Sequence, residues 1–304
     1  MIERDLVLHF SNEVHDALLS KMPIVALEST IISHGLPRPQ NLEVAREVEA
    51  IVRRRGATPA TIAVIDGVVH IGLNDSELQG IANRDDIAKA SSRDLAIAVA
   101  SSSSAATTVA ATAHLAALAG ISVFATGGLG GVHRGANESF DESADLTALA
   151  SLDITVVCAG VKSILDVGAT LERLETLAIG LVGFQTTKFP GFYLTDSGFT
   201  IEHRVESAGD VARICQARKI LKTNCAALIV ANPVTQEMSR ALHDEILASG
   251  LSSAKAAGVS GKAVTPFLLE HFHSSSHGES LRVNIEIIKS NAALAADIAV
   301  ALIP

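Results

Sequence analysis

Two lysines and two acidic residues lie at the ends of hydrophobic segments in a chain with only 19% charged residues: Glu28, Lys89, Asp141 and Lys162. A glycine-rich loop falls between them in the sequence. An amine can attack a carbonyl carbon, a carboxyl group can transfer protons, and glycine N–H groups can approach a phosphate closely. We therefore expect a site that handles a phosphorylated carbonyl compound or sugar.

Lys162 belongs to the segment with the clearest chemical pattern, Val156–Asp166. An apolar strand leads to Gly160, and the pattern predicts that a helix begins close to the lysine. The positive end of a helix dipole and burial both disfavour a protonated amine. We therefore expect a lowered pKa for Lys162, as a nucleophilic amine requires.

Glu28 and Lys89 each have two interpretations. Glu28 lies between Leu27 and the uncharged segment 29–32, and such surroundings would raise its pKa, as a general acid requires. Alternatively it caps a helix or forms a structural ion pair. Lys89 either binds a phosphate or is a solvated loop cation, and its sequence surroundings alone favour the second.

The glycine-rich loop is Gly127–Gly131. It matches neither the dinucleotide nor the P-loop pattern, because His133 stands where a third Rossmann glycine would fall and no Gly-Lys-Ser/Thr follows. We expect its backbone N–H groups to approach an anion, with His133 and Arg134 adding phosphate contacts. The alternative is a tight turn that needs positive φ angles.

The acidic segment Asp141–Asp145 could hold a hard divalent cation through carboxylates and waters, although Leu146 replaces the glycine of a calcium loop. The alternative is helix capping by Ser143, with Asp145 in the first turn. A second candidate metal segment, His271–His277, carries three serines and has no nearby cysteine. We interpret it as an exposed loop rather than a zinc site.

Apolar runs alternate with helical periodicity along the chain, which predicts one α/β domain over residues 1–304 with a mostly parallel sheet. Asp66-Gly67 predicts a hairpin, and Asn41 a helix N-cap. Glu28, the glycine loop, Lys162 and Asn232 all follow strands, and ligands bind at the carboxyl ends of parallel strands. The predicted strands are Ile24–Leu27, Thr61–Ile65, Val68–Ile71, Ile121–Ala125, Ile154–Cys158, Ile179–Phe184 and Ala226–Ala231, and the predicted helices are Leu42–Arg54, Thr107–Ala119, Ala144–Ser151, Ser163–Leu177, Ala208–Leu221, 236–257 and 280–302.

Composition excludes several classes of protein. The net charge is −9, and no basic run suits a nucleic acid polymer. Residues 95–133 lack Asp, Glu, Lys and Arg, but their serines, threonines and glycines do not suit a membrane span. The three cysteines have no metal-type spacing and the N-terminus has no apolar signal segment, so we expect a cytoplasmic protein.

Four motifs resemble those of the pseudouridine-5′-phosphate glycosidase family, which includes the indigoidine-cluster A proteins, and the resemblance extends over about residues 12–300. They are ALESTIISHG at Ala26–Gly35, FATGGLGGVHRG at Phe124–Gly135, VCAGVKSILD at Val157–Asp166 and TPFLL at Thr265–Leu269. The resemblance implies an α/β/α sandwich, a homotrimer, and reversible cleavage of pseudouridine 5′-phosphate to uracil and ribose 5-phosphate.

The resemblance also implies roles for individual residues. Lys162 would be the covalent nucleophile on ring-opened ribose, Glu28 the proton donor and acceptor, and Asp141 the residue that holds Mn²⁺ through waters. Mg²⁺ suits the same ligands. Further residues would line the substrate site: Lys89, Val109, Thr126, His133, Ser143, Ala144, Asp145 and Asn284.

Two other functions remain open from the residues themselves. A Schiff-base aldolase or lyase acting on another sugar phosphate would also use Lys162, but it would not need Asp141. A non-catalytic sugar-phosphate sensor would tolerate loss of Lys162 and Glu28, and both are present.

Overall fold

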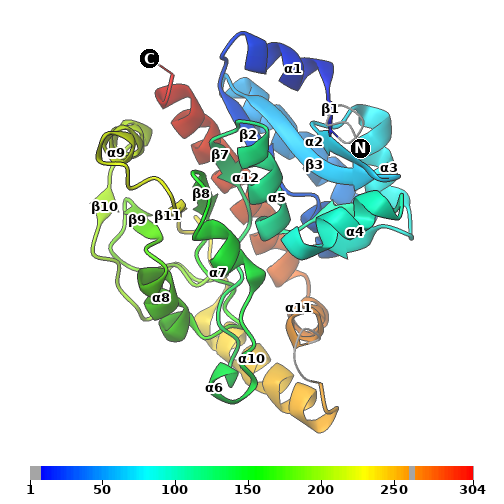
Figure 1. Cartoon of the computed structure of the whole chain (residues 1–304). Coiled ribbons are helices and arrows are strands. Elements are labelled where there is room, and N and C mark those ends of the chain that lie inside the picture. Colours follow the sequence, from blue (N-terminus) through cyan, green and yellow to red (C-terminus); the bar gives the residue numbers. More distant parts are fainter. Residues whose placement is uncertain (1–7, 260–263, 304) are drawn as a thin grey trace.

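A computed structural model describes residues 8–259 and 264–303 (Figure 1). Both ends of the expected 1–304 domain lie outside this part, which forms one α/β fold. Its strands are β1 (Leu8–Phe10), β2 (Ile24–Leu27), β3 (Thr58–Ile65), β4 (Val68–Ile71), β5 (Ala88–Ala90), β6 (Ala105–Thr107), β7 (Val123–Ala125), β8 (Thr155–Cys158), β9 (Gly180–Phe184), β10 (Arg204–Val205) and β11 (Leu228–Ala231).

Helices connect most of these strands. The α-helices are α1 (Asn12–Leu19), α2 (Gln40–Arg54), α3 (Asp75–Asn83), α4 (Leu95–Ala100), α5 (Val109–Leu118), α6 (Ala136–Ser139), α7 (Ala144–Leu149), α8 (Val167–Thr176), α9 (Ala208–Leu221), α10 (Arg240–Ala256), α11 (Val264–Ser275) and α12 (Glu279–Ala301). A π-helix, η2 (Ile31–Gly35), and a 3₁₀-helix, η3 (Ser92–Asp94), complete the described elements.

The central sheet is mostly parallel, as predicted. Its main order is β1-β4-β3-β2-β7-β8-β11-β9-β10, with β6 paired to β3 and β5 paired to β6. Only β3–β4 and β3–β6 pair antiparallel among the described strands. Because β2, β7, β8 and β11 run in the same direction, their carboxyl ends meet at one edge of the sheet. The residues that follow these strands are therefore brought together.

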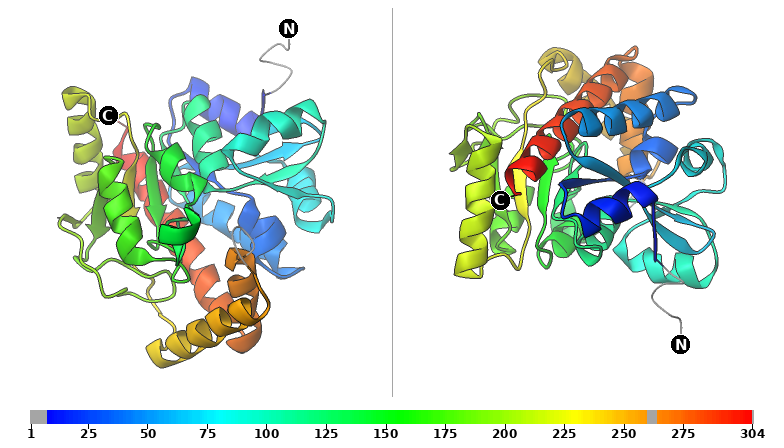
Figure 2. Two further views of the ribbon diagram at one scale, coloured as in Figure 1. Left: turned by 60° about the horizontal axis from the view of Figure 1, so that its bottom comes forward. Right: turned by 90° about the horizontal axis from the view of Figure 1, so that it is seen from above.

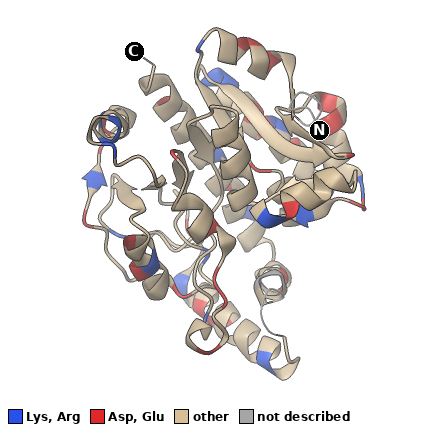
Figure 3. Cartoon of the chain, in the orientation of Figure 1, with Lys and Arg blue, Asp and Glu red and all other residues tan. Residues whose placement is uncertain are grey.

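Helices cover both faces of the sheet, which confirms the α/β/α sandwich. Val25 and Leu27 of β2 face a core shared with α2, α9 and α12, and α2 lies beside α12 in Figure 2. Ile24 and Ala26 face the opposite core, which includes residues of α1, α5, α7 and α8. This division follows from the alternation of side chains along a strand. Figure 3 shows that the central strands are almost free of charged residues.

The β3–β4 hairpin is confirmed. Asp66 and Gly67 have φ angles of 50° and 84°, and two positive φ angles are what a type I′ turn requires. Asp66 is held there because the hydroxyl of Ser104 donates to its carboxylate, at 2.9 Å.

Several predicted element boundaries differ from the structure, and two of them concern helices near the candidate site. The helix after Lys162 begins at Val167, not at Ser163, because Asp166 caps it by accepting from the N–H of Ala169 at 3.0 Å. The helix expected from Thr107 begins at Val109, since Thr107 belongs to β6.

Asn41 does not cap α2, which already begins at Gln40. Its buried amide instead donates to the carbonyls of Ile32 and Ala82, at 2.8 and 2.9 Å. The amide thus ties α2 to the π-helix η2 and to α3.

The segment His271–His277 is not a loop over most of its length. Residues 271–275 form the last turns of α11, and the ring of His271 hydrogen-bonds to the hydroxyl of Ser249 at 2.8 Å. No helix in the described part of the chain is both long and apolar enough to cross a membrane.

Candidate active site

Glu28 directly follows β2, where two neighbouring hydroxyl groups fix the backbone. The hydroxyl of Ser29 donates to the carbonyl of Ile62 at 2.7 Å and accepts from the N–H of Thr107 at 2.9 Å. The hydroxyl of Thr30 donates to the carbonyl of Thr107 at 2.8 Å. The π-helix η2 then begins at Ile31, and such helices occur often at functional sites.

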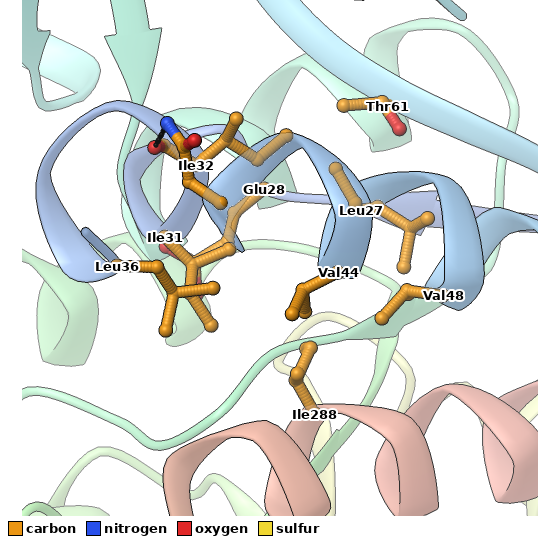
Figure 4. Close-up of a pocket in the computed structure, with 11 residues that line it drawn as sticks. Leu27, Glu28, Ile31, Ile32, Leu36, Val44, Val48, Thr61 and Ile288 are labelled. Atoms are coloured by element: carbon orange, nitrogen blue, oxygen red, sulfur yellow. Dashed lines mark hydrogen bonds between the residues drawn. The ribbon is translucent and has the colours of Figure 1, made fainter. Parts of the chain in front are cut away.

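The carboxyl group of Glu28 lies between polar groups and an apolar pocket. The buried hydroxyl of Thr126 donates to Oε1 of Glu28. Figure 4 shows Leu27, Val44 and Ile288 around the pocket beside Glu28. Burial raises the pKa of Glu28, and this outweighs the lowering effect of the nearby positive charges and of the hydroxyl. The environment therefore favours a protonated carboxyl group, as the sequence predicted.

Lys162 lies in the loop between β8 and α8 and is partly buried. Val161 pairs with Leu129 of the glycine loop, and the N–H of Lys162 donates to the carbonyl of Leu129 at 3.2 Å. Because α8 begins only at Val167, the expected position of Lys162 at a helix N-terminus is wrong. Its ammonium group is nevertheless close enough to act electrostatically on Glu28.

Lys89 is not a loop residue, because it lies on β5 opposite Ala106 of β6. Burial lowers its pKa, and repulsion by Lys162 lowers it further. The residue is nevertheless solvent-exposed. Both findings agree if the side chain lines a concave surface, where water reaches it while protein atoms surround it. Lys89 also acts electrostatically on Glu28, so the two lysines and the carboxyl group form one cluster.

Asp145 adds a negative charge to this cluster and is almost fully buried. Its two oxygens accept from the N–H groups of Ala110 and Gly130, at 3.0 and 2.8 Å. Asp145 therefore joins α5, the glycine loop and α7. The predicted cap is confirmed, because Ser143 accepts from the N–H of Asp145 at 3.2 Å.

The loop needs glycines because neighbouring side chains lie where a Cβ atom would be. Positive φ angles are not the reason, since none of Gly127, Gly128, Gly130 and Gly131 has one. A Cβ atom at Gly130 would lie 2.2 Å from Oγ of Ser143 and 2.7 Å from Oδ2 of Asp145. The N–H groups of Leu129 and Gly130 donate to oxygens of the protein itself. These two donors therefore hold the site together and are not free to bind the anion of a ligand.

Among the three acids of segment 141–145, Asp141 is the one whose carboxylate accepts from neither an arginine nor a backbone N–H. Glu142 accepts from Nε of Arg173 at 2.9 Å, and both oxygens of Asp145 are taken. Oδ2 of Asp141 lies 3.7 Å from Nδ1 of His133. One free carboxylate suits a hard cation that keeps most of its water, such as Mg²⁺ or Mn²⁺.

The remaining predicted residues surround this arrangement. Val109 begins α5, next to Ala110, and Ala144 lies between Ser143 and Asp145. Oδ1 of Asn284 would lie 3.6 Å from a Cβ atom placed on Gly127. Asn232 follows β11 as predicted, but its amide donates to Oδ1 of Asn291 at 2.9 Å.

Asn291 is a supporting residue that the sequence patterns did not reveal. It is buried on α12, and its amide donates to the carbonyls of Thr126 and Gly127, at 2.8 and 3.3 Å. The sequence indicates it only as a polar residue within an otherwise apolar helical segment. Ser29 and Thr107 were also missed, because their bonds link positions 78 residues apart.

Comparison with known proteins places these features in context. A family model described as "Indigoidine synthase A like protein" matches residues 13–301. A protein of Salinispora tropica named "Pseudouridine-5'-phosphate glycosidase" is 60% identical, over 95% of this chain and 90% of its own. A Frankia alni protein of the same name is 56% identical, over 96% of this chain and 81% of its own.

Two solved structures share the fold. The prealnumycin C-glycosynthase AlnA, solved in complex with ribulose 5-phosphate, has a TM-score of 0.90 and 33% identity, over 97% of each chain. An indigoidine synthase A-like protein of Thermotoga maritima has a TM-score of 0.89 and 37% identity, over 99% of this chain and 98% of its own. The similarity therefore extends over nearly the entire fold.

Proposed function

Because this chain belongs to the family of indigoidine synthase A like proteins, we propose that it is a pseudouridine-5′-phosphate glycosidase. It would cleave the C–C glycosidic bond of pseudouridine 5′-phosphate reversibly, giving uracil and ribose 5-phosphate. The observation that carries the proposal is the cluster of Glu28, Lys162 and Lys89 at the carboxyl edge of the sheet. The curated relatives named above share this proposed activity by name.

The substrate explains why a lysine and one carboxylic acid suit the reaction. A C-glycoside has no heteroatom leaving group, so the two-carboxylate route of ordinary glycosidases fits poorly. In our proposal, the neutral amine of Lys162 bonds to C1′ while the C1′–O4′ bond opens, and O4′ takes up the proton that the attacking nitrogen loses. The ring-opened ribose then remains attached to both the lysine nitrogen and uracil C5.

Glu28 would supply the proton for the second step. Protonation of uracil C5 by the neutral carboxyl group lets the C1′–C5 bond break, and its electron pair restores the C5–C6 double bond of uracil. The nitrogen lone pair of Lys162 forms the C1′=N bond at the same time. Water then hydrolyses this imine, which releases ribose 5-phosphate and the amine. A carboxyl group whose pKa is raised by burial is suited to this role.

The other predicted residues would bind the substrate around this pair. We propose that Lys89 binds the phosphate through its charge. The residues Val109, Thr126, His133, Ser143, Ala144, Asp145 and Asn284 would line the site. Asp141 would hold Mn²⁺ or Mg²⁺ through waters, and a bound cation would supply positive charge that neutralises the phosphorylated substrate.

We also propose that the protein works as a homotrimer in the cytoplasm, in pseudouridine catabolism. The trimer rests on family resemblance. The cytoplasmic location fits a phosphorylated substrate and three free cysteines, of which Cys225 is exposed.

The test is to incubate the purified protein with pseudouridine 5′-phosphate and Mn²⁺ and to quantify free uracil by chromatography. Release of uracil that stops on chelation and returns with Mn²⁺ is the expected result. Absence of uracil from folded, metal-supplemented protein would contradict the proposal and would direct the search to other sugar phosphates.

A further inference from the structure

A second group of metal-binding residue types lies away from Glu28, at the edge of the sheet formed by β1. His9 of β1 and His70 of β4 are opposite each other in the register, and their ring centroids are 4.9 Å apart. Glu77 of α3 approaches the same point, with Oε1 3.2 Å from Nδ1 of His70. One donor atom from each of these three residues lies within 4.8 Å of the other two.

The hydrogen bonds leave these donor atoms available. Nδ1 of His70 is buried, and although Oε1 of Glu77 lies 3.2 Å from it, the two atoms are not aligned for a hydrogen bond. Glu77 uses Oε2 in the capping box of α3, where it accepts from the N–H of Asn74 at 2.8 Å. Oε1 is the oxygen that faces the imidazole. A buried polar atom without a partner is costly, and an ion between the imidazoles and the carboxylate would remove that cost.

We propose that His9, His70 and Glu77 form a binding site for a divalent transition-metal ion of the Zn²⁺ class. Two imidazoles and a carboxylate are typical ligands of this class, and a water would complete a tetrahedral set. Ligand atoms at about 2.0–2.1 Å from a tetrahedral ion are about 3.4 Å apart. His9 is exposed on an edge strand, so its ring can turn to close the remaining gap.

The alternative is a plain ion pair between His70 and Glu77, which would require a protonated imidazole. That pair would not involve His9, whose ring centroid lies 4.9 Å from that of His70. Asp66 also acts on this ring, but its carboxylate binds Ser104 and Arg84. It adds negative charge without being a ligand.

The site would have a structural role. β1 has three residues, and among the described strands it pairs with β4 alone. An ion shared by β1, β4 and α3 would hold this edge strand in place. The three ligands are separate from the Glu28 cluster. Binding of a metal ion at this site should therefore raise the thermal stability of the protein and leave the active-site chemistry unaffected.

The experiment titrates untagged full-length protein with Zn²⁺ against a chromophoric chelator and repeats it with Co²⁺, whose visible absorption reports the geometry. The variants are His9→Ala and Glu77→Gln, in an Asp141→Asn background that removes the other cation site. Gln can still accept from Asn74, so the helix cap is kept. His273→Ala on α11 is the control for unrelated histidines.

We expect one Zn²⁺ per chain and a Tm about 5 °C higher at a hundredfold excess over Kd. His9→Ala and Glu77→Gln should each weaken binding at least about tenfold, and His273→Ala should not. Binding that is unchanged in both variants, or lost equally in His273→Ala, would overturn the proposal. Uracil release by His9→Ala in the Asp141-containing protein should match the parent, so this test is independent of the proposed activity.

Discussion

The amide of Asn291, on the C-terminal helix α12, donates to the carbonyl of Thr126 at 2.8 Å. The hydroxyl of the same threonine donates to the carboxyl group of Glu28. Thr126 therefore joins α12 to the proposed acid. The buried face of α12, which packs on the same face of the sheet as α2 and α9, supports the site.

We expect Asn291→Leu to destabilise the protein and to reduce activity. The substitution leaves the carbonyl of Thr126 buried without a partner, whereas the amide of Asn232 keeps its bond to the hydroxyl of Ser290 at 3.1 Å. An unsatisfied buried group costs about 1–3 kcal/mol, so the free energy of unfolding should fall by about that amount in urea titrations. Asn224→Ala, which removes an exposed bond to Asp153, is the control. Equal stability of the two variants would contradict the role of Asn291.

Gly130→Ala should inactivate the protein, because the added methyl group would lie 2.2 Å from Oγ of Ser143 and 2.7 Å from Oδ2 of Asp145. Asp145 would have to leave its position between α5 and the glycine loop. Gly80→Ala is the matched control, since no atom lies within 4 Å of its added methyl group. That change within α3 should stabilise the protein by about 0.5–1 kcal/mol. Activity assays and thermal melting of both variants check the prediction, and wild-type activity in Gly130→Ala would refute it.

Lys162→Ala should abolish uracil release while preserving the fold, because no other group supplies the covalent bond in our mechanism. In the parent protein, borohydride should trap ribose 5-phosphate on the peptide that contains residue 162. Trapping on Lys89 instead would show that the roles of the two lysines are exchanged. Lys219→Ala, at an exposed position of α9, should retain full activity.

Thr126→Val should raise the pKa of Glu28 further, because the lost hydroxyl stabilises the charged form. The falling alkaline limb of kcat/KM should then move to higher pH, since Glu28 acts while protonated. The folded-state pKa exceeds the unfolded value, so its contribution to stability is full below the unfolded pKa and is lost as pH rises through the folded pKa. In the variant, the pH range over which this contribution to stability is present should extend to higher pH. A ¹³C NMR titration of Glu28, assigned with Glu28→Gln, measures the change. A pKa that stays the same or falls would contradict the role of the hydroxyl.

Asp141→Asn should weaken activation by Mn²⁺ at least about tenfold, because the amide carries no charge to hold the cation. Glu142→Gln is the control on the adjacent residue, which forms a surface ion pair with Arg173. Metal titrations of uracil release compare the two variants. Equal metal dependence in both would place the cation elsewhere.

Much of the fold and the candidate site follows from local sequence patterns. Alternating hydrophobic runs predict the parallel sheet, and Asp66-Gly67 predicts the hairpin because its two residues tolerate positive φ. Glu28, the glycine loop and Lys162 could be placed together because parallel strands end at one edge. The raised pKa of Glu28 was predictable from its apolar neighbours.

Only the tertiary structure decided which groups support the site. α8 begins at Val167 and not at Ser163, because Asp166 caps it and the preceding Val161 pairs with Leu129 of the glycine loop. Ser29 with Thr107, and Asn291 with Thr126, are far apart in sequence, so no local period relates them. The close approach of His9, His70 and Glu77 likewise depends on the pairing of β1 with β4. Local periodicity determines which segments form strands and helices, whereas contacts between distant segments determine which polar atoms meet.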